Sequence, residues 1–336
     1  MKMKKIQKTL AMLLLVVLMI SACGGAENEA TVVEVPADIF KVAVVMPSAI
    51  NDLAFSQSMY DALLAIQADT GADSFEIVYS EGMFIVDDAA AAIRDYASQG
   101  FDLVIAHGSQ YGSSLQEIAP DFLETSFAWG TTVDTFGLPN IFAYEARAEE
   151  GGYVNGVMAT MLSESAVIGV VGPIETGDAK LYVDGFAVGA AATDAGTEVN
   201  TNWIGSFSDV ALASEAAQTH IGAGADVLTG TAQMVVGAIG AAEENGALWF
   251  GTQSSQSSLA PSIVVANQVY RWEVVLEDMI DLIHGGTYGG QSFEITLANG
   301  GLVIEFNGDY ALPADVQSAA DATIAGIIDG SISVFP

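Results

Sequence analysis

The fold is decided by Lys41-Val42-Ala43-Val44-Val45-Met46 and by the segment that follows it, Pro47-Ser48-Ala49-Ile50-Asn51-Asp52-Leu53-Ala54-Phe55-Ser56-Gln57. The first segment is apolar almost throughout, which is typical of a strand covered on both faces of a parallel sheet. The second segment is small and polar, as in a loop, and it leads into a helical pattern over residues 53–69. A strand, a loop and a helix in this order form the repeating unit of an α/β fold.

The same unit recurs in two series along the chain. The first series predicts strands at Lys41–Met46, Phe75–Tyr79, Leu103–Ala106, Ser126–Trp129 and Ile141–Tyr144, with helices at about 53–69, 87–99 and 110–118. The second predicts strands at Val167–Val171, Val199–Ile204, Val227–Thr229 and Leu248–Gly251, with helices at about 179–195, 209–223 and 233–245. Each series has the length of a small domain, about a hundred residues. The sequence therefore predicts two similar lobes, each a parallel sheet flanked by helices.

The C-terminal segment departs from this pattern. Ser292–Leu297 and Leu302–Phe306 flank Ala298-Asn299-Gly300-Gly301, which favours a β-hairpin. A helix at about 314–329 is predicted to close the chain. We expect the first lobe to comprise residues 40–147 and about 252–286, and the second to comprise 148–251 and about 287–336.

The N-terminus has the parts of a bacterial export signal in the required order. Four lysines, at positions 2, 4, 5 and 8, precede an apolar run from Leu10 to Ile20, and Ile20-Ser21-Ala22-Cys23 resembles the lipobox of lipoproteins. The alternatives are a membrane-spanning anchor and a buried structural cysteine. The apolar run is about half the length of roughly 20 residues that a spanning helix needs. We expect a signal peptide over 1–22, lipidation of Cys23 and an acidic tether over 23–39.

The strong negative charge of the chain makes anionic binding partners unfavourable. All 42 acidic residues follow Cys23, and four of the nine basic residues precede it, so the mature chain has a formal charge of 5 − 42 = −37. Nucleic acid and anionic membrane surfaces repel such a body, so membrane contact is expected through the lipid anchor only. The five remaining bases are Lys41, Arg94, Arg147, Lys180 and Arg271. For each, an ion pair within the protein is favoured over a ligand contact.

The sequence lacks the patterns of a catalyst. The three histidines lie on separate predicted elements, and only His107 with Ser109 offers a base near a nucleophile. Neither a G-x-S-x-G elbow nor a Walker sequence occurs. The only cysteine, Cys23, is assigned to lipidation, so the usual zinc ligands are missing. We expect neither an enzyme, nor a cofactor, nor a metal site.

The polar residues gather after the predicted strands. In open parallel sheets, ligands bind beyond the carboxyl ends of the strands. Two sheets that face each other across these loops would form a cleft. The loops are Pro47–Gln57, His107-Gly108-Ser109-Gln110, Gly172–Lys180, Ser206–Asp209, Thr229–Thr231 and Thr252–Gln256.

The same loops carry a resemblance to a known family. It rests on Asn51–Ser58, Glu145–Tyr153, Ile168–Gly172, Asp184-Gly185-Phe186 with Gly189-Ala190, Gly205–Asp209, Gly224–Val227 and Leu259-Ala260-Pro261. In order and spacing these segments resemble the basic membrane protein family of substrate-binding lipoproteins, over about 40–336. The resemblance implies a two-lobed periplasmic-binding-protein type I fold with hinge crossovers. It also implies capture of a purine nucleoside or base for an ABC permease, on the extracytoplasmic side of the cell membrane.

The resemblance also implies a set of site residues. Phe55 occupies the family's aromatic position and is expected to stack on the ligand ring, since offset stacking contributes about 1 kcal/mol beyond area burial. Asp52, Ser56 and Gln57 are expected to contact the ligand edge or to cap the helix. The remaining candidates are His107, Gly108, Ser109, Lys180, Phe207, Thr231, Gln253 and Tyr270.

Two positions depart from the family's nucleoside-binding pattern. Gln253 stands where these members have an aspartate that accepts hydrogen bonds from ribose, and Tyr270 stands where they have a lysine. A carboxylate binds sugar hydroxyls more strongly than an amide does. The departures favour a free base or another small planar molecule. A surface sensor, or a binder of a sugar or an amino acid on the same fold, stays as the alternative.

Overall fold

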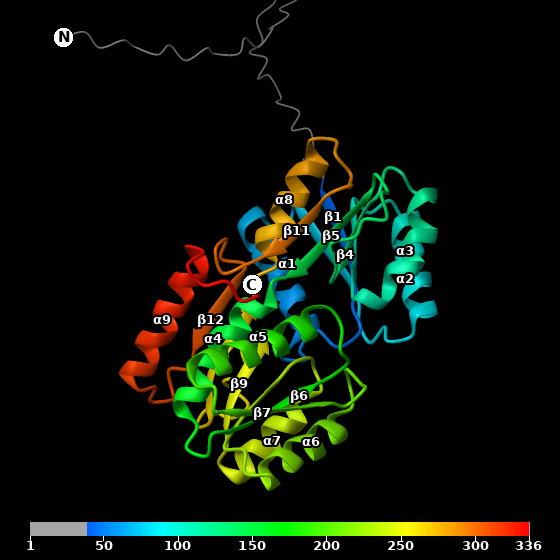
Figure 1. The fold of residues 1–336 in the computed structure, drawn as a ribbon. Helices are drawn as coiled ribbons and strands as arrows, with labels where there is room; N and C mark the ends of the chain where they lie inside the picture. The colour runs from blue at the N-terminus through cyan, green and yellow to red at the C-terminus, as the bar shows by residue number, and fades with distance from the viewer. Residues whose placement is uncertain (1–38, 336) are drawn as a thin grey trace, which may run out of the picture. The chain divides into compact units, whose positions relative to one another are not determined.

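The computed structural model describes residues 39–335. The predicted signal peptide, Cys23 and nearly all of the predicted tether lie outside these residues. The described chain forms two six-stranded sheets, each covered by helices, in two lobes (Figure 1). This is the predicted α/β architecture, and it has the two-lobed periplasmic-binding type I arrangement.

The first sheet has the strand order β11-β5-β4-β3-β1-β2. The strands are β1 (Phe40–Val45), β2 (Phe75–Ser80), β3 (Leu103–His107), β4 (Ser126–Gly130), β5 (Ile141–Ala146) and β11 (Ser292–Ile295), all paired in parallel. Every residue of β3, β4 and β5 is buried, because helices cover both faces. The helices of this lobe are α1 (Phe55–Thr70), α2 (Val86–Ser98), α3 (Gly112–Ile118) and α8 (Glu273–His284).

The second sheet has the strand order β12-β10-β9-β8-β6-β7. Its strands are β6 (Val167–Gly172), β7 (Glu198–Trp203), β8 (Val227–Gly230), β9 (Leu248–Gln253), β10 (Val264–Tyr270) and β12 (Leu302–Phe306). Only β12 runs antiparallel, against β10. Its helices are α4 (Ala148–Leu162), α5 (Gly177–Thr193), α6 (Val210–Gly222), α7 (Val235–Asn245) and α9 (Ala314–Ile328).

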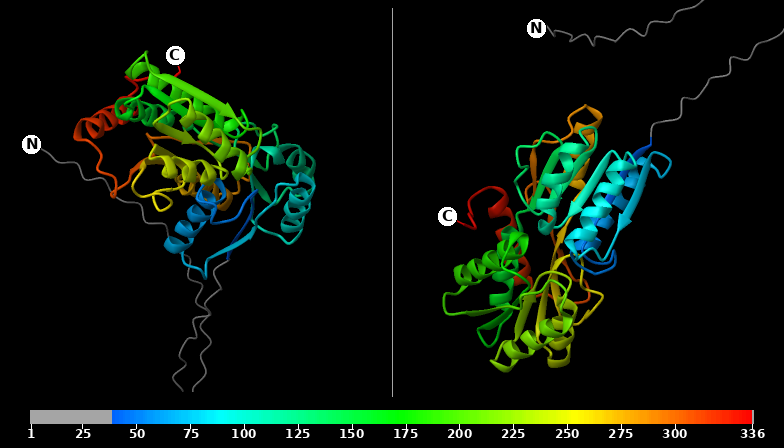
Figure 2. Two further views of the ribbon diagram at one scale, coloured as in Figure 1. Left: turned by 90° about the horizontal axis from the view of Figure 1, so that it is seen from below. Right: turned by 90° about the vertical axis from the view of Figure 1, so that its right-hand side faces the viewer.

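Helices α4 and α5 pack unusually closely. A Cβ added at Gly152 of α4 would lie 2.4 Å from the carbonyl oxygen of Tyr182 in α5. A Cβ added at Gly156 would lie 2.2 Å from the carbonyl oxygen of Phe186. The two backbones therefore meet along glycines, where any side chain would separate them. Figure 2 shows this helix pair on one face of the second lobe.

The chain crosses between the lobes three times. The crossings join β5 to α4, β10 to α8, and β11 to β12. This arrangement corrects the predicted hairpin: β11 pairs with β5 and β12 with β10, so the turn at residues 298–301 connects two lobes instead of two neighbouring strands. It also changes the expected lobe division, because β10 belongs to the second sheet and β11 to the first. Periodicity alone cannot distinguish these pairings, since each strand alternates similarly in either sheet.

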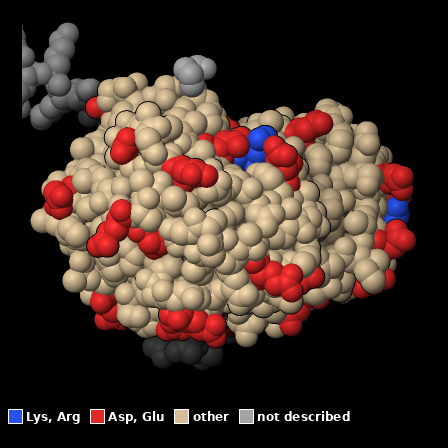
Figure 3. Space-filling model, turned by 60° about the horizontal axis from the view of Figure 1, so that its bottom comes forward, with Lys and Arg blue, Asp and Glu red and all other residues tan. Residues whose placement is uncertain are grey.

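The sequence patterns missed three elements, α4, β10 and α8, and placed the ends of the others within a few residues. Among residues 39–335, no helix is long and apolar enough to span a membrane. Figure 3 shows acidic side chains scattered over one face, with the few basic side chains lying among them. Each of Arg94, Arg147 and Lys180 forms an ion pair with a carboxylate, as expected for most of the bases.

Candidate ligand-binding site

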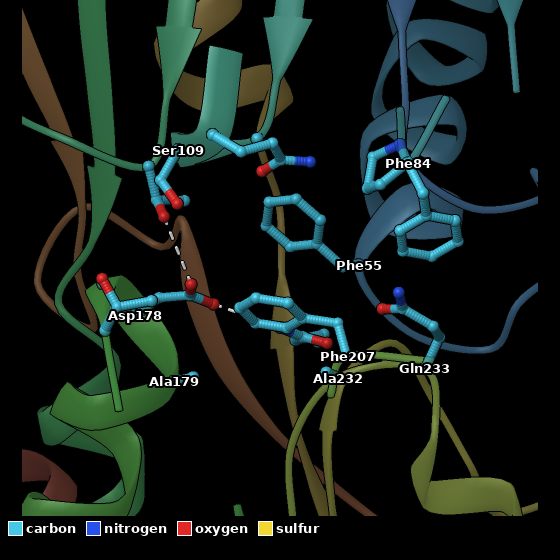
Figure 4. A pocket seen from close by; sticks show the side chains of 15 residues that line it. Phe55, Phe84, Ser109, Asp178, Ala179, Phe207, Ala232 and Gln233 are labelled. Carbon is cyan, nitrogen blue, oxygen red and sulfur yellow. Dashed lines mark hydrogen bonds between the residues drawn. The ribbon is translucent and has the colours of Figure 1, made fainter. Parts of the chain in front are cut away.

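A pocket lies between the lobes, at the carboxyl ends of the strands in both sheets. The enclosed part of the pocket measures about 40 Å³, within about 480 Å³ of empty space that extends into open solvent. Phe55, Phe84 and Ser109 line it from the first lobe, and Asp178, Phe207 and Gln253 line it from the second. Figure 4 shows Phe55 and Phe207 pointing into the pocket from opposite lobes, with Phe84 at its side. The pocket is thus aromatic on several sides and polar at its edges, as ligand sites commonly are.

Phe55 is held in place by His107. The two rings are stacked, with centroids 3.8 Å apart and planes 10° from parallel. His107 is fully buried and lies behind Phe55, so it does not line the pocket. One face of Phe55 is therefore occupied by the imidazole, while the side chain still reaches the pocket.

The hydrogen bonds of His107 determine its tautomer. Nε2 lies 3.0 Å from the Phe55 carbonyl oxygen, which can only accept, so Nε2 carries the proton. Nδ1 must then accept from the Tyr144 hydroxyl, 2.7 Å away. Burial lowers the pKa of His107 to about 3, against a smaller opposite effect of the Phe55 carbonyl. His107 is thus a neutral support for Phe55 and has no free nitrogen for catalysis.

The polar residues of the first loop hold the start of α1. The Asp52 carboxylate accepts the backbone N–H groups of Ala54, Ser56 and Gln57, at 2.9 to 3.1 Å. The Ser56 hydroxyl is buried against the Ser48 hydroxyl, at 2.6 Å, and Gln57 accepts the Leu53 N–H. Neither Asp52, Ser56 nor Gln57 lines the pocket. Asp52 therefore caps the start of α1, whereas the Ser56 and Gln57 side chains bond to Ser48 and Leu53 in the loop before the helix.

Asp178, at the start of α5, is the one acidic side chain among the residues that line the pocket. It accepts hydrogen bonds from Gln253 Nε2 at 3.1 Å and Tyr270 Oη at 3.0 Å, both to Oδ2, and from Thr131 Oγ1 at 3.3 Å to Oδ1. Burial raises the pKa of Asp178, while these donors and the Ala179 N–H act in the opposite direction. Thr131 belongs to the first lobe, so this contact joins the lobes at the pocket.

Three of the strand-end loops hold a non-glycine residue in the left-handed region. Leu53, Ala232 and Gln253 have φ values of 53°, 72° and 70°. Such backbone is uncommon for residues with a side chain and concentrates at functional sites. Ala232 and Gln253 both line the pocket, and Leu53 directly precedes α1 and Phe55. Two further non-glycine residues with positive φ, Phe136 and Ala166, lie outside the pocket lining.

Of the other predicted site residues, some line the pocket and the rest lie outside its lining. Gly108, Ser109, Phe207 and Gln253 line the pocket with Phe55. Thr231 is buried beside it, and Tyr270 reaches it only through its hydrogen bond to Asp178. Lys180 does not line the pocket and is half-exposed, with its ammonium 2.8 Å from Asp184 and 3.1 Å from Glu175. Nearby acids therefore hold this base outside the cleft.

The comparisons with known proteins agree with this geometry. The family described as "ABC transporter substrate-binding protein PnrA-like" matches residues 39–333. The chain belongs to this family. A purine-binding protein of Brucella abortus is 26% identical over 78% of this chain and 74% of its own length. The nucleoside-binding protein BmpA of an ABC transporter in Lactococcus lactis is 21% identical over 98% and 99%.

Solved structures show the same fold in other members of the ABC solute-binding class. A solute-binding protein of Conexibacter woesei superposes with a TM-score of 0.72 at 23% identity, over 88% of this chain and 98% of its own. One from Aeropyrum pernix superposes with a TM-score of 0.74 at 18% identity, over 88% and 92%. The family membership makes the chain a substrate-binding protein of an ABC transporter, with a small-molecule ligand and a permease as partners.

Sequence reasoning missed several residues of the pocket. Asp178 lies in the predicted loop Gly172–Lys180, but among 42 acids it carried no distinguishing signal. Phe84 and Gln233 likewise follow predicted strands and line the pocket. All three follow the carboxyl ends of strands, β6, β2 and β8, where ligands bind in open parallel sheets.

Proposed function

We propose that the chain is an extracytoplasmic, lipid-anchored binding protein that captures a purine-type base or nucleoside for import. One observation carries the proposal: Phe55 and Phe207 point into the same pocket from opposite lobes, with polar groups at its sides. Aromatic rings above and below suit a flat heterocycle, because stacked pairs gain about 1 kcal/mol beyond area burial. Relatives whose names specify purine or nucleoside binding support the ligand class.

The arrangement of the lobes supports a capture mechanism. Each lobe provides part of the pocket, and three crossings connect the lobes. A ligand that contacts both lobes stabilises the arrangement in which they face each other, because it gains contacts only there. The permease can then distinguish the liganded protein. Cys23 would hold the protein near the permease through its lipid.

The ligand proposal is tested by isothermal titration calorimetry of the purified mature chain with adenine, guanine, hypoxanthine, adenosine and inosine. We expect at least one of these to bind with a dissociation constant well below 1 mM, about −4.1 kcal/mol. A sugar and an amino acid serve as negative controls. Binding of a control ligand with no purine binding would assign the pocket to the alternative ligands.

Labelling of the intact chain with a radioactive fatty acid, with Cys23→Ser as the control, tests the proposed lipid anchor.

A surface sensor is the second candidate, and one relative favours it. The transcriptional activator protein med of Bacillus subtilis is 26% identical over 84% of this chain and 84% of its own length. A sensor and an importer would share the pocket and differ in the partner that recognises the liganded protein: a signalling protein for the sensor and a permease for the importer. Uptake of a labelled purine by cells with and without the gene separates them: an importer requires the protein for uptake, whereas a sensor does not.

A further inference from the structure

Asp178 is a buried carboxylate surrounded by neutral groups. Its side-chain hydrogen-bond partners are an amide, a phenol and a hydroxyl, from Gln253, Tyr270 and Thr131. Arg147 is engaged by Glu149, and Lys180 by Glu175 and Asp184. A buried charge is costly unless it is paired. The pocket therefore favours a ligand that brings positively polarised N–H groups to Asp178 and disfavours anions.

Gln253 provides a second acceptor beside Asp178. The amide nitrogen of Gln253 donates to the Asp178 carboxylate at 3.1 Å. Its Oε1 is then directed elsewhere, and among the described residues this buried oxygen has no hydrogen-bond partner. An acceptor that is buried without a donor costs about 1–3 kcal/mol, so a ligand donor there would be favourable.

Gln233 provides a donor on the other side of the pocket. Its Nε2 is buried and, within residues 39–335, has no acceptor. Figure 4 shows Asp178 and Gln233 on opposite sides of the Phe55 and Phe207 rings. A flat ligand between those rings would thus meet two acceptors at one end and a donor at the other.

We propose that Asp178 and Gln253 form a double-acceptor edge that selects a base with two neighbouring N–H donors. This inference rests on the proposed function and narrows it. Among purine bases, a 2-amino-6-oxopurine presents this pattern through its ring N1–H and its 2-amino group, and its imidazole nitrogens can accept from Gln233. Hypoxanthine lacks the 2-amino group, adenine lacks the N1–H, and xanthine places a carbonyl where the amino group would be. Asp178 and Gln253 are therefore specificity-determining residues.

Equilibrium dialysis of the unmodified protein with labelled guanine, and competition by the other bases, tests the selection. Loss of one hydrogen bond to a charged acceptor costs about 10- to 100-fold in affinity. We expect guanine to bind about tenfold or more tightly than hypoxanthine, adenine and xanthine. Equal or tighter binding of these three would overturn the inference but leave the proposed function intact. Absence of binding by every purine base and nucleoside would instead remove the proposed function.

The variant Asp178→Asn tests the role of the carboxylate itself. An asparagine amide can donate to the xanthine 2-carbonyl, which a carboxylate repels, so the guanine-to-xanthine affinity ratio should fall about tenfold or more. Loss of a merely structural contact would weaken both bases alike and leave this ratio unchanged, and that result would overturn the assignment of Asp178. Asp184→Asn, the same change on the exposed face of α5, is the matched control and should leave the ratio at the wild-type value. If Asp178→Asn does not fold, the base series on the wild-type protein still decides the inference.

Discussion

Phe55 and His107 lie face to face, 3.8 Å apart between ring centroids, and the Phe55 carbonyl accepts the His107 Nε2 proton. The same residue pair is thus joined through both its rings and its backbone. Because His107 in turn accepts from Tyr144, the orientation of Phe55 is set from within the first lobe. This preorganisation reduces the conformational entropy that ligand binding would otherwise cost.

We expect Phe207→Ala to weaken purine binding without unfolding the protein. Phe207 is half-buried on a loop, so its loss leaves the core intact. Stacking of a base on an aromatic side chain contributes about 1–3 kcal/mol by alanine substitution, or about 5- to 150-fold in affinity. Calorimetry measures the affinity, and thermal unfolding checks the fold. Tyr288→Ala, at an exposed aromatic residue outside the pocket, is the control. Unchanged affinity in Phe207→Ala would remove the stacking role.

We expect a free base to bind more tightly than the corresponding nucleoside. Gln253 and Tyr270, which we predicted to stand at the positions of an acid and a base in nucleoside-binding members, both donate to Asp178. A ribose would therefore find neither a carboxylate nor a lysine at these positions. Calorimetry with hypoxanthine and inosine compares the two directly. A nucleoside that binds tenfold tighter than its base would show that other groups hold the sugar.

We expect Glu145→Gln to increase stability at neutral and alkaline pH. Burial, and secondarily the charge of Asp178, raise the pKa of Glu145 to about 9, from 4.5. Its contribution to stability is therefore present in full below pH 4.5 and is lost as pH rises toward about 9. Glutamine cannot ionise and avoids this loss.

The free energy of unfolding, measured with urea between pH 4 and 9, tests this expectation. The variant and the wild type should be similar near pH 4.5 or below, and the variant's advantage should grow by up to about 1.4 kcal/mol per pH unit above it. Glu76→Gln, at an exposed position of β2, is the control. A pH-independent difference would contradict the burial of an ionisable Glu145.

We expect Tyr144→Phe to destabilise the first lobe by about 1–3 kcal/mol, because His107 Nδ1 would become a buried acceptor without a donor. Urea unfolding at pH 7 measures the loss, and Tyr79→Phe, with an exposed ring, is the control. Phe55 should also be held less firmly, so ligand affinity should fall together with stability. Full stability in this variant would mean that water replaces the hydroxyl.

The fold was largely predictable from local patterns. Nine strands of the two series and the helices between them follow from apolar runs, period and turn residues, since these patterns depend on neighbours along the chain. The lobe exchange near the C-terminus was not predictable. Strands β10, β11 and β12 each pair with a distant strand, and a short turn at residues 298–301 is compatible with either a hairpin or a crossing.

The sequence by itself determined the two-lobed α/β class, the acidic composition and the loops that form the pocket, and it predicted Phe55 and Gln253 as candidates within those loops. Only the tertiary structure decided which polar side chains in those loops face a ligand. The Asp52 carboxylate accepts N–H groups at the start of α1, whereas Ser56 bonds to Ser48 and Gln57 to the Leu53 N–H. Lys180 pairs with nearby acids. Asp178 instead becomes the one acidic side chain of the pocket lining, because Gln253, Tyr270 and Thr131 reach it from three separate strand ends. Such convergence depends on contacts between residues up to 92 positions apart, which no local pattern encodes.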